Sequence, residues 1–186
     1  ARLYADLDAG STMVGWEQAY AYRGTFDGNG HTLTFNVPDH NRENLAPFVW
    51  VGNATIKNLH TAGTITSSKK FIGGLISQVL PNANATVENC RVSVTINTSV
   101  NGDANNGGLV TVVNTDATVM FRNCKFDGSF DGTNCSHNGG YVGYANGAVI
   151  VDNCVFAPDH INTKPDGCAT WARIGTGYYT LINSYA

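Results

Sequence analysis

Val87-Glu88-Asn89-Cys90, a four-residue stretch near the middle of the chain, has four counterparts that follow one another at a nearly constant spacing. Two keep the Asn-Cys pair and two carry Leu or Ser after the Asn: Phe121-Arg122-Asn123-Cys124, Val151-Asp152-Asn153-Cys154, Ile56-Lys57-Asn58-Leu59 and Leu181-Ile182-Asn183-Ser184. The five asparagines are separated by 31, 34, 30 and 30 residues. A period of this length indicates a repeat architecture, in which each repeat is one small unit that stacks on the next.

A second marker runs in phase with the first. It reads Gly73-Gly74-Leu75, Gly107-Gly108-Leu109 and Gly139-Gly140-Tyr141, with steps of 34 and 32 residues. The same spacing places Ala169-Thr170-Trp171 in a degenerate fourth copy. Because two independent markers keep a common register, we expect a single domain. Residues 31–186 would form stacked coils, preceded by an N-terminal cap and first turn in residues 1–30.

Each repeat contains short runs of alternating apolar residues. In one repeat, Thr86 to Cys90 is followed by Val92, Val94 and Ile96 at a period of two, then by a polar loop and by Gly107 to Val113. Three short strands without an intervening amphipathic helix are typical of one coil of a β-solenoid. A propeller blade needs about 40 residues and four strands. The chain is therefore predicted to be all-β, a parallel β-helix of about five coils with 30–34 residues per coil.

The composition excludes several classes of protein. Gly, Asn and Thr make up about a third of the chain, and only 13% of the residues are charged, with a net charge of −3. The residues that usually fill helix surfaces are scarce, so a helical fold is disfavoured. Without a basic cluster we expect no nucleic-acid partner, and without a long apolar run we expect no membrane insertion. Since the chain opens at Ala1, we expect a processed product or a segment of a larger protein.

The marker asparagines and cysteines have a structural interpretation. Asn tolerates the left-handed backbone of a tight bend, and stacked amides can bond from coil to coil. We therefore predict an Asn ladder (Asn58, Asn89, Asn123, Asn153, Asn183) and beside it a ladder of free, buried thiols (Cys90, Cys124, Cys154). Cys135 and Cys168 lie outside this frame and are candidates for a disulfide across the coil step. The repeat alignment sets Cys168 opposite Asn138, three residues from Cys135, so the geometry can also forbid that bond.

Two further stretches carry a resemblance to a known family. They are Gly24-Thr25-Phe26-Asp27-Gly28-Asn29-Gly30-His31-Thr32-Leu33 and Asn53-Ala54-Thr55-Ile56-Lys57-Asn58-Leu59. Together with the Gly-Gly-Leu and Asn-Cys markers they resemble GLUG-type β-helical repeat domains of large surface and secreted proteins of gut Bacteroidetes and Firmicutes. The resemblance implies a right-handed β-helix, a secreted or cell-surface location in bacteria, and adjacent domains in the same polypeptide. It implies no reaction, and the aromatic residues Tyr141 and Trp171 depart from the pattern.

Motifs for metal binding and catalysis are weak. Asp27 and Asn29 resemble the start of a calcium loop, but the Glu that an EF-hand needs at position 12 is missing, so a structural turn is the preferred interpretation. Asp6 and Asp8 share one strand face without a third carboxylate nearby. The five His residues form no zinc motif, and no Ser lies in a nucleophile-elbow motif. We expect no cofactor and no catalytic residue.

Two functional alternatives stay open. Parallel β-helix enzymes that act on acidic polysaccharides, lyases or glycoside hydrolases, gather carboxylates and bases on one outer face. The candidates here do not coincide from coil to coil: Asp103, Asp116, Asp127, Asp131, Lys125 and Arg173. An ice-binding face is disfavoured because Thr32, Thr34, Thr64, Thr66 and Thr95 keep no common register.

A non-enzymatic binding or spacer domain is the favoured alternative. Aromatic side chains can stack on sugar rings, and the candidates are Trp50, Tyr144, Tyr178 and Tyr179. Tyr141 and Trp171 are expected in the core, and Tyr178, Tyr179 and Tyr185 are alternatively expected to cover the end of the helix or meet a following domain. The polar loops 38–45, 97–106 and 131–138 would form the binding surface for a host or environmental glycan or protein.

Overall fold

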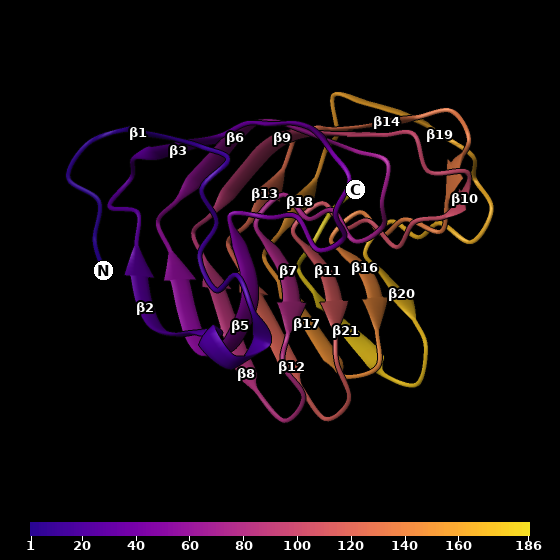
Figure 1. Cartoon of the computed structure of the whole chain (residues 1–186). Helices are drawn as coiled ribbons and strands as arrows, with labels where there is room; N and C mark the ends of the chain where they lie inside the picture. Colours follow the sequence, from indigo (N-terminus) through magenta and orange to yellow (C-terminus); the bar gives the residue numbers. More distant parts are fainter.

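The computed structural model describes residues 1–186 as a stack of short parallel strands (Figure 1). The strands form three faces. Face 1 holds β2 (Tyr22–Asp27), the second half of β5 (Phe48–Lys57), β8 (Asn84–Glu88), β12 (Thr118–Arg122), β17 (Ala148–Asp152) and β21 (Tyr178–Ile182). Face 3 holds the first half of β5, β7 (Ile76–Val79), β11 (Val110–Val113), β16 (Val142–Ala145) and β20 (Ala172–Ile174). Because β5 pairs with β8 through its second half and with β7 through its first, it bends around the corner between faces 1 and 3.

Face 2 lies between the other two along the chain. It contains β1 (Leu7–Gly10), β3 (Thr32–Phe35), β4 (Val37–His40), β6 (His60–Ser67), β9 (Arg91–Thr98), β13 (Lys125–Phe126), β14 (Ser129–Gly132), β18 (Val155–Phe156) and β19 (His160–Thr163). All pairings between these strands are parallel. The predicted all-β parallel solenoid of about five coils is therefore confirmed.

The first residues already follow the path of a coil. Isolated bridges join Arg2 to Asp27 on face 1 and Val14 to Phe48 on face 3, and β1 pairs with β3 on face 2. The only helix, the 3-10 helix η1 (Gln18–Tyr20), then leads into β2. The structure contains no helix with the length and hydropathy of a membrane span.

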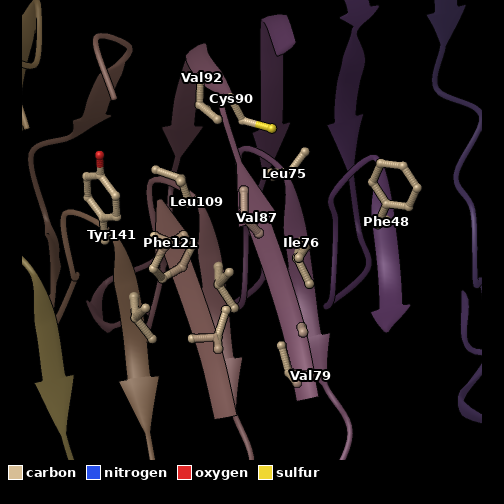
Figure 2. Close-up of a cluster of buried hydrophobic side chains, with 14 of the residues drawn as sticks. Phe48, Leu75, Ile76, Val79, Val87, Cys90, Val92, Leu109, Phe121 and Tyr141 are labelled. Atoms are coloured by element: carbon tan, nitrogen blue, oxygen red, sulfur yellow. The ribbon is translucent and has the colours of Figure 1, made fainter. Parts of the chain in front are cut away.

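Inward side chains stack in columns along the solenoid. One column on face 1 runs Phe26, Ile56, Val87, Phe121, Val151 and Leu181. Figure 2 shows Val87 and Phe121 pointing into the same interior as Leu75, Leu109 and Tyr141. These residues belong to a core of 40 buried residues, and Trp171 lies in the same core. Tyr141 and Trp171 therefore lie in the core, as expected.

The paired glycines are required where two coils approach closely. A Cβ atom on Gly107 would overlap the carbonyl oxygen of Val110 in its own coil and lie within 2.9 Å of the Gly143 nitrogen in the next coil. A Cβ atom on Gly108 would overlap the carbonyl oxygen of Gly140 in the next coil. Any side chain there would force the backbones apart. This contact explains why the Gly-Gly marker repeats.

The marker asparagines occupy tight bends between faces 1 and 2. All five have left-handed backbone, with φ between 45° and 53°. The side-chain amide of Asn89 donates to Asn58 Oδ1 (3.1 Å), Asn123 to Asn89 (2.9 Å) and Asn153 to Asn123 (2.7 Å). Asn58 in turn donates to Asp27 Oδ1 (3.0 Å). The side-chain ladder therefore starts at a carboxylate and runs to Asn153, while Asn183 contributes only its backbone conformation.

The cysteines after the markers lie inside the stack. Cys90, Cys124 and Cys154 are free and buried, and the backbone N–H of Cys124 lies 3.4 Å from Cys154 Sγ. A hydrogen bond with Cys154 lowers the pKa of the Cys124 thiol, but a hydrogen bond with Cys90 and burial outweigh it and raise that pKa to about 12. The Cys124 thiol is therefore a protonated packing group.

The candidate disulfide between Cys135 and Cys168 does not form, because both thiols are free. Asn138 lies opposite Cys168 in the coil register and contacts both sulfurs. Its side-chain amide donates to Cys135 Sγ (3.2 Å), and its backbone N–H donates to Cys168 Sγ (3.3 Å). Cys135 instead belongs to a small buried cluster with Val100 and Ala104, beside the short sheet of β10 (Gly102–Asp103) and β15 (Cys135–Ser136).

A second column of residues with left-handed backbone was not predicted from the sequence. It lies in the connections from face 2 to face 3 and consists of Asn44, Phe71, Asn105, His137 and Gly167, with φ from 51° to 67°. Isolated bridges at neighbouring positions keep these residues in register. These five positions carry different residue types, so the sequence shows no repeated residue from which the column could be predicted.

Candidate functional site

Two columns of polar side chains lie on the outer surface of face 2. One contains Thr32, His60, Arg91 and Lys125, which are register partners on β3, β6, β9 and β13. The next outward column contains Ser93 and, one coil later, Asp127. Alternate residues of a strand share one face, so the register of four coils brings these groups together. We call them the face 2 network.

Asp127 is the centre of the face 2 network. Its carboxylate accepts hydrogen bonds from Arg91 Nη2 (2.8 Å), Lys125 Nζ (2.9 Å) and Ser93 Oγ (2.6 Å). Burial alone would raise the pKa of Asp127, but these three hydrogen bonds outweigh it and hold the pKa at about 2. The hydrogen bond to Asp127 in turn raises the pKa of Arg91. The carboxylate is therefore ionised and fully engaged.

The direction of the hydrogen bonds fixes the state of His60. Because ionised Asp127 can only accept, the single proton of Ser93 Oγ points to it. His60 Nε2, 2.9 Å from Ser93 Oγ, must then donate, and Nδ1 accepts from Thr32 Oγ1 at 3.3 Å. Burial, with a smaller effect of Arg91, lowers the pKa of His60 and favours this neutral form. Because His60 Nε2 donates to Ser93 Oγ, His60 cannot act as the base for Ser93, unlike the His of a catalytic Ser-His pair.

The network continues to the first coil. Asp6 Oδ1 accepts from the Thr32 backbone N–H (2.9 Å) and lies 3.4 Å from His31 Nδ1. The Thr32 hydrogen bond lowers the pKa of Asp6. Asp8 Oδ1 accepts from the Gly10 N–H at 2.9 Å. Asp6 and Asp8 thus serve the local backbone, in keeping with a structural role for this strand.

A column of alternating charge runs along the edge of face 1. Its members, each in register with the next, are Arg2, Asp27, Lys57, Glu88, Arg122 and Asp152. Arg122 Nε lies 3.8 Å from Asp152 Oδ2, and Arg2 Nε lies 3.8 Å from Asp27 Oδ2. Four of these residues immediately precede a marker Asn, so the column could have been found from the sequence.

The candidate metal ligands Asp27 and Asn29 have other partners. Asp27 Oδ1 accepts from the Asn58 amide (3.0 Å) and the Asn29 backbone N–H (2.9 Å), and the Asn58 bond lowers its pKa. The Asn29 side-chain oxygen accepts from Arg2 Nη2. The oxygens of this turn accept hydrogen bonds from the Arg2 guanidinium and the Asn58 amide. These partners support a structural turn over a metal site.

The candidate residues for an enzyme are only partly gathered. Lys125 and Asp127 meet in the face 2 network, whereas Asp103 lies on β10, 3.9 Å from Lys70. The other three are also separated from it: Asp131 accepts from Asn162 (2.9 Å), Asp116 occupies a left-handed turn and Arg173 donates to Asn105 and to the carbonyl oxygens of His137 and Gly143. Lys125 and Asp127 belong to the same coil, so their contact does not align candidates from coil to coil.

The candidate aromatic ligands divide into two pairs. Trp50 and Tyr144 share an outward column of face 3, with Gln78 and Val112 between them. Three coil steps place them about 14 Å apart. Tyr178 and Tyr179 instead lie on β21 at the end of the stack, where both are exposed. The four residues therefore do not form one site.

The Thr register differs from the expectation at one pair. Thr64 and Thr95 are direct register partners, which was not expected. Thr32, Thr34 and Thr66 pair with His60, Ala62 and Asn97, so the five residues keep no common register. Thr25, Thr55 and Thr86 also align on face 1. That column continues with Met120 and Ile150, however, which interrupts the Thr array.

One concave feature adjoins the face 2 network. A cavity of about 250 Å³ lies at the corner of faces 1 and 2 and is lined by Gly30, Asn58, Leu59, His60, Asn89 and Arg91. Arg91 and His60 are its only ionisable lining residues. No family model, no curated protein and no solved structure matches this chain.

Proposed function

We propose that this chain is a non-enzymatic extracellular β-helix domain of a bacterial surface protein, acting as a rigid spacer with a ligand-binding surface. The observation that carries the proposal is the pairing of outward polar groups from coil to coil. The Asn ladder, the charge column of face 1 and the face 2 network each link successive coils. Such pairing favours a stiff rod, and it agrees with the resemblance to GLUG-type repeats.

The ligand-binding part of the proposal rests on two surfaces. Trp50 and Tyr144 are half-buried on face 3 and offer ring surface for sugar stacking. The cavity beside His60 and Arg91 offers hydrogen-bond donors on face 2. A glycan with hydroxyl and acidic groups fits this combination of aromatic and basic groups.

A glycan array and a polysaccharide-degradation screen on the same purified chain test the proposal. We expect glycan binding without product release, weakened in Trp50→Ala with Tyr144→Ala or in Arg91→Ala. Tyr4→Ala, which removes an exposed aromatic ring elsewhere, is the matched control. Binding that survives all these variants would reject the two surfaces, and released product would reject the non-enzymatic assignment.

The second candidate function is a polysaccharide lyase or glycoside hydrolase. The observation that favours it is the convergence of Asp127, Lys125, Arg91 and His60 on one outer sheet face. An enzyme would release shorter saccharides in the same screen, and Asp127→Asn would abolish that release. Product release from Asp127→Asn at the wild-type rate would remove the face 2 network from consideration.

A further inference from the structure

A row of threonines crosses the outer surface of face 1. Thr25, Thr55 and Thr86 are register partners on β2, β5 and β8, so the row advances by about 4.8 Å per coil (Figure 1). Thr25 is exposed, and the other two are half-buried. Their hydroxyls have no hydrogen-bond partner within the chain, whereas those of Thr32 and Ser93 in the face 2 network do. The row therefore presents hydroxyl groups that are free to bond to a ligand.

Two asparagines lie beside this row, on the side nearer face 3. Asn53 and Asn84 are exposed and lie two residues before Thr55 and Thr86 on the same strands. Alternate residues of a strand point to the same side, so the amides and the hydroxyls share the outer surface. The backbone N–H of Asn84 donates to Asn53 Oδ1 (2.8 Å), which orients the Asn53 side chain. Both side-chain NH₂ groups remain free to donate.

The place of Asn53 follows from an irregularity in the strand pairing. Tyr22 pairs with Val51 and Gly24 with Ala54, so β5 has one residue more than β2 between these two pairs. Such a β-bulge redirects side chains, and bulges are frequent beside functional sites. Gly24, with φ of 127°, faces this surface without a side chain that would cover it.

The threonine row, the two asparagines and Gly24 line one open recess of about 300 Å³. This volume is at the lower end of the range of small-ligand pockets. No ionisable side chain lines the recess. The charge column next to it alternates in sign at Asp27, Lys57 and Glu88, so neither sign predominates. The recess therefore fits a polar ligand without charge.

The backbone beneath the recess is already paired. β5 pairs with β2 on one side and with β8 on the other, so a peptide cannot add to it as a further strand. A ligand must bond to hydroxyls and amides, which donate and accept hydrogen bonds as sugar hydroxyls do. Met120, the next residue of the row after Thr86, is half-buried and adds an apolar contact for the C–H face of a sugar ring.

We propose that this recess binds an uncharged saccharide that lies along the threonine row and bonds to the amides of Asn53 and Asn84. The site is separate from the aromatic pair on face 3 and from the cavity beside His60 and Arg91. It adds an uncharged ligand class to the proposed function, and it can be tested without the other two surfaces.

Uncharged hexasaccharides of the cello, malto, laminari, xylo and manno series are the probes, titrated into the isotope-labelled chain and followed by nuclear magnetic resonance. We expect at least one to bind at millimolar concentration or below and to shift the side-chain amide signals of Asn53 and Asn84. Thr55→Val with Thr86→Val keeps the branched shape but removes two hydroxyls, and should weaken binding about tenfold. Thr55→Ser with Thr86→Ser keeps the hydroxyls and should bind like the wild type.

Thr64→Val with Thr95→Val is the matched control, because these residues are register partners on the outer surface of face 2. It should leave the affinity unchanged. Circular dichroism checks that each variant keeps its β structure, and Asn84→Ala replaces the valine pair on face 1 should that pair unfold. Absence of binding by every hexasaccharide overturns the proposal, as does binding that the face 1 variants leave unchanged. Binding lost only in Trp50→Ala or Arg91→Ala also overturns it, while leaving the proposed function intact.

Discussion

The side-chain amide of Asn123 donates to the side-chain oxygen of Asn89, one coil earlier, at 2.9 Å. Both residues also have left-handed backbone, with φ of 53° and 52°. The backbone alone would accept Gly at these bends. The amide ladder explains why Asn is found there instead of Gly. Asn therefore contributes to stability in two ways that can be measured separately, through its left-handed backbone and through its side-chain hydrogen bonds.

Asn89→Gly should destabilise the domain less than Asn89→Ala. Gly keeps the left-handed bend and loses two ladder hydrogen bonds, which costs roughly 1–2 kcal/mol. Ala loses the same bonds and adds about 1–2 kcal/mol of backbone strain. The free energy of unfolding from urea titrations distinguishes the two variants.

Asn183→Gly is the control for the ladder, because Asn183 has the left-handed bend without a side-chain bond to Asn153. We expect that variant to lie close to the wild type. Equal losses for Asn89→Gly and Asn183→Gly would show that the ladder contributes nothing to stability.

Glu88→Lys should destabilise the solenoid in a salt-dependent manner. Glu88 lies between Lys57 and Arg122 in the charge column, so the substitution places three cations in register. Like charges directly opposite one another on neighbouring strands cost about 0.5–1 kcal/mol. The loss measured by thermal unfolding should shrink at high salt, which screens surface charges. Glu88→Gln removes the charge without reversing it, and a loss as large as that of Glu88→Lys would argue against repulsion.

The repeat was predictable from sequence because the backbone conformation at each marker position favours one residue type. A left-handed bend selects Asn, and close approach of two backbones selects Gly, whichever coil they belong to. The face 2 network was missed, although His60, Arg91 and Lys125 each lie two residues after a marker Asn. The carboxylates Asp103, Asp116, Asp127 and Asp131 share only a residue type, which does not distinguish Asp127 from the others.

Other features depend on register that no local pattern reveals. The direction of the hydrogen bonds from His60 through Ser93 to Asp127 follows from the geometry of three coils. The hydrogen bond from the Asn138 side-chain amide to Cys135 Sγ depends on the side-chain conformation in the coil. The sequence alignment set Cys168 opposite Asn138, and only the structure showed that this neighbour contacts both sulfurs.

Stability should fall in acid as Asp127 becomes protonated. Its folded-state pKa of about 2 lies below the ordinary value of 3.8. Between these values the unfolded state binds more protons, so the contribution is fully present above about pH 4 and is lost as the pH falls toward 2. We expect roughly 1–2 kcal/mol of the free energy of unfolding to depend on this group.

Asp127→Asn should lower the free energy of unfolding already at neutral pH. Below pH 4 its free energy of unfolding should depend less on pH than that of the wild type. Urea titrations across the acid range measure both effects. Asp39→Asn, at an exposed position on β4, is the matched control and should keep the wild-type profile. An unchanged acid dependence in Asp127→Asn would mean that other carboxylates account for it.

Thiol reagents should label one cysteine of the native protein rapidly, and that residue should be Cys168. It is exposed, whereas Cys90, Cys124, Cys135 and Cys154 are buried. The thiolate is the reactive form, and burial raises the pKa of Cys135. Maleimide labelling followed by mass spectrometry should therefore show one rapid adduct on the native chain and five on the unfolded chain. Cys168→Ser should remove the rapid adduct, and rapid labelling that remained on Cys135 would show that the loop from residue 131 to residue 138 opens in solution.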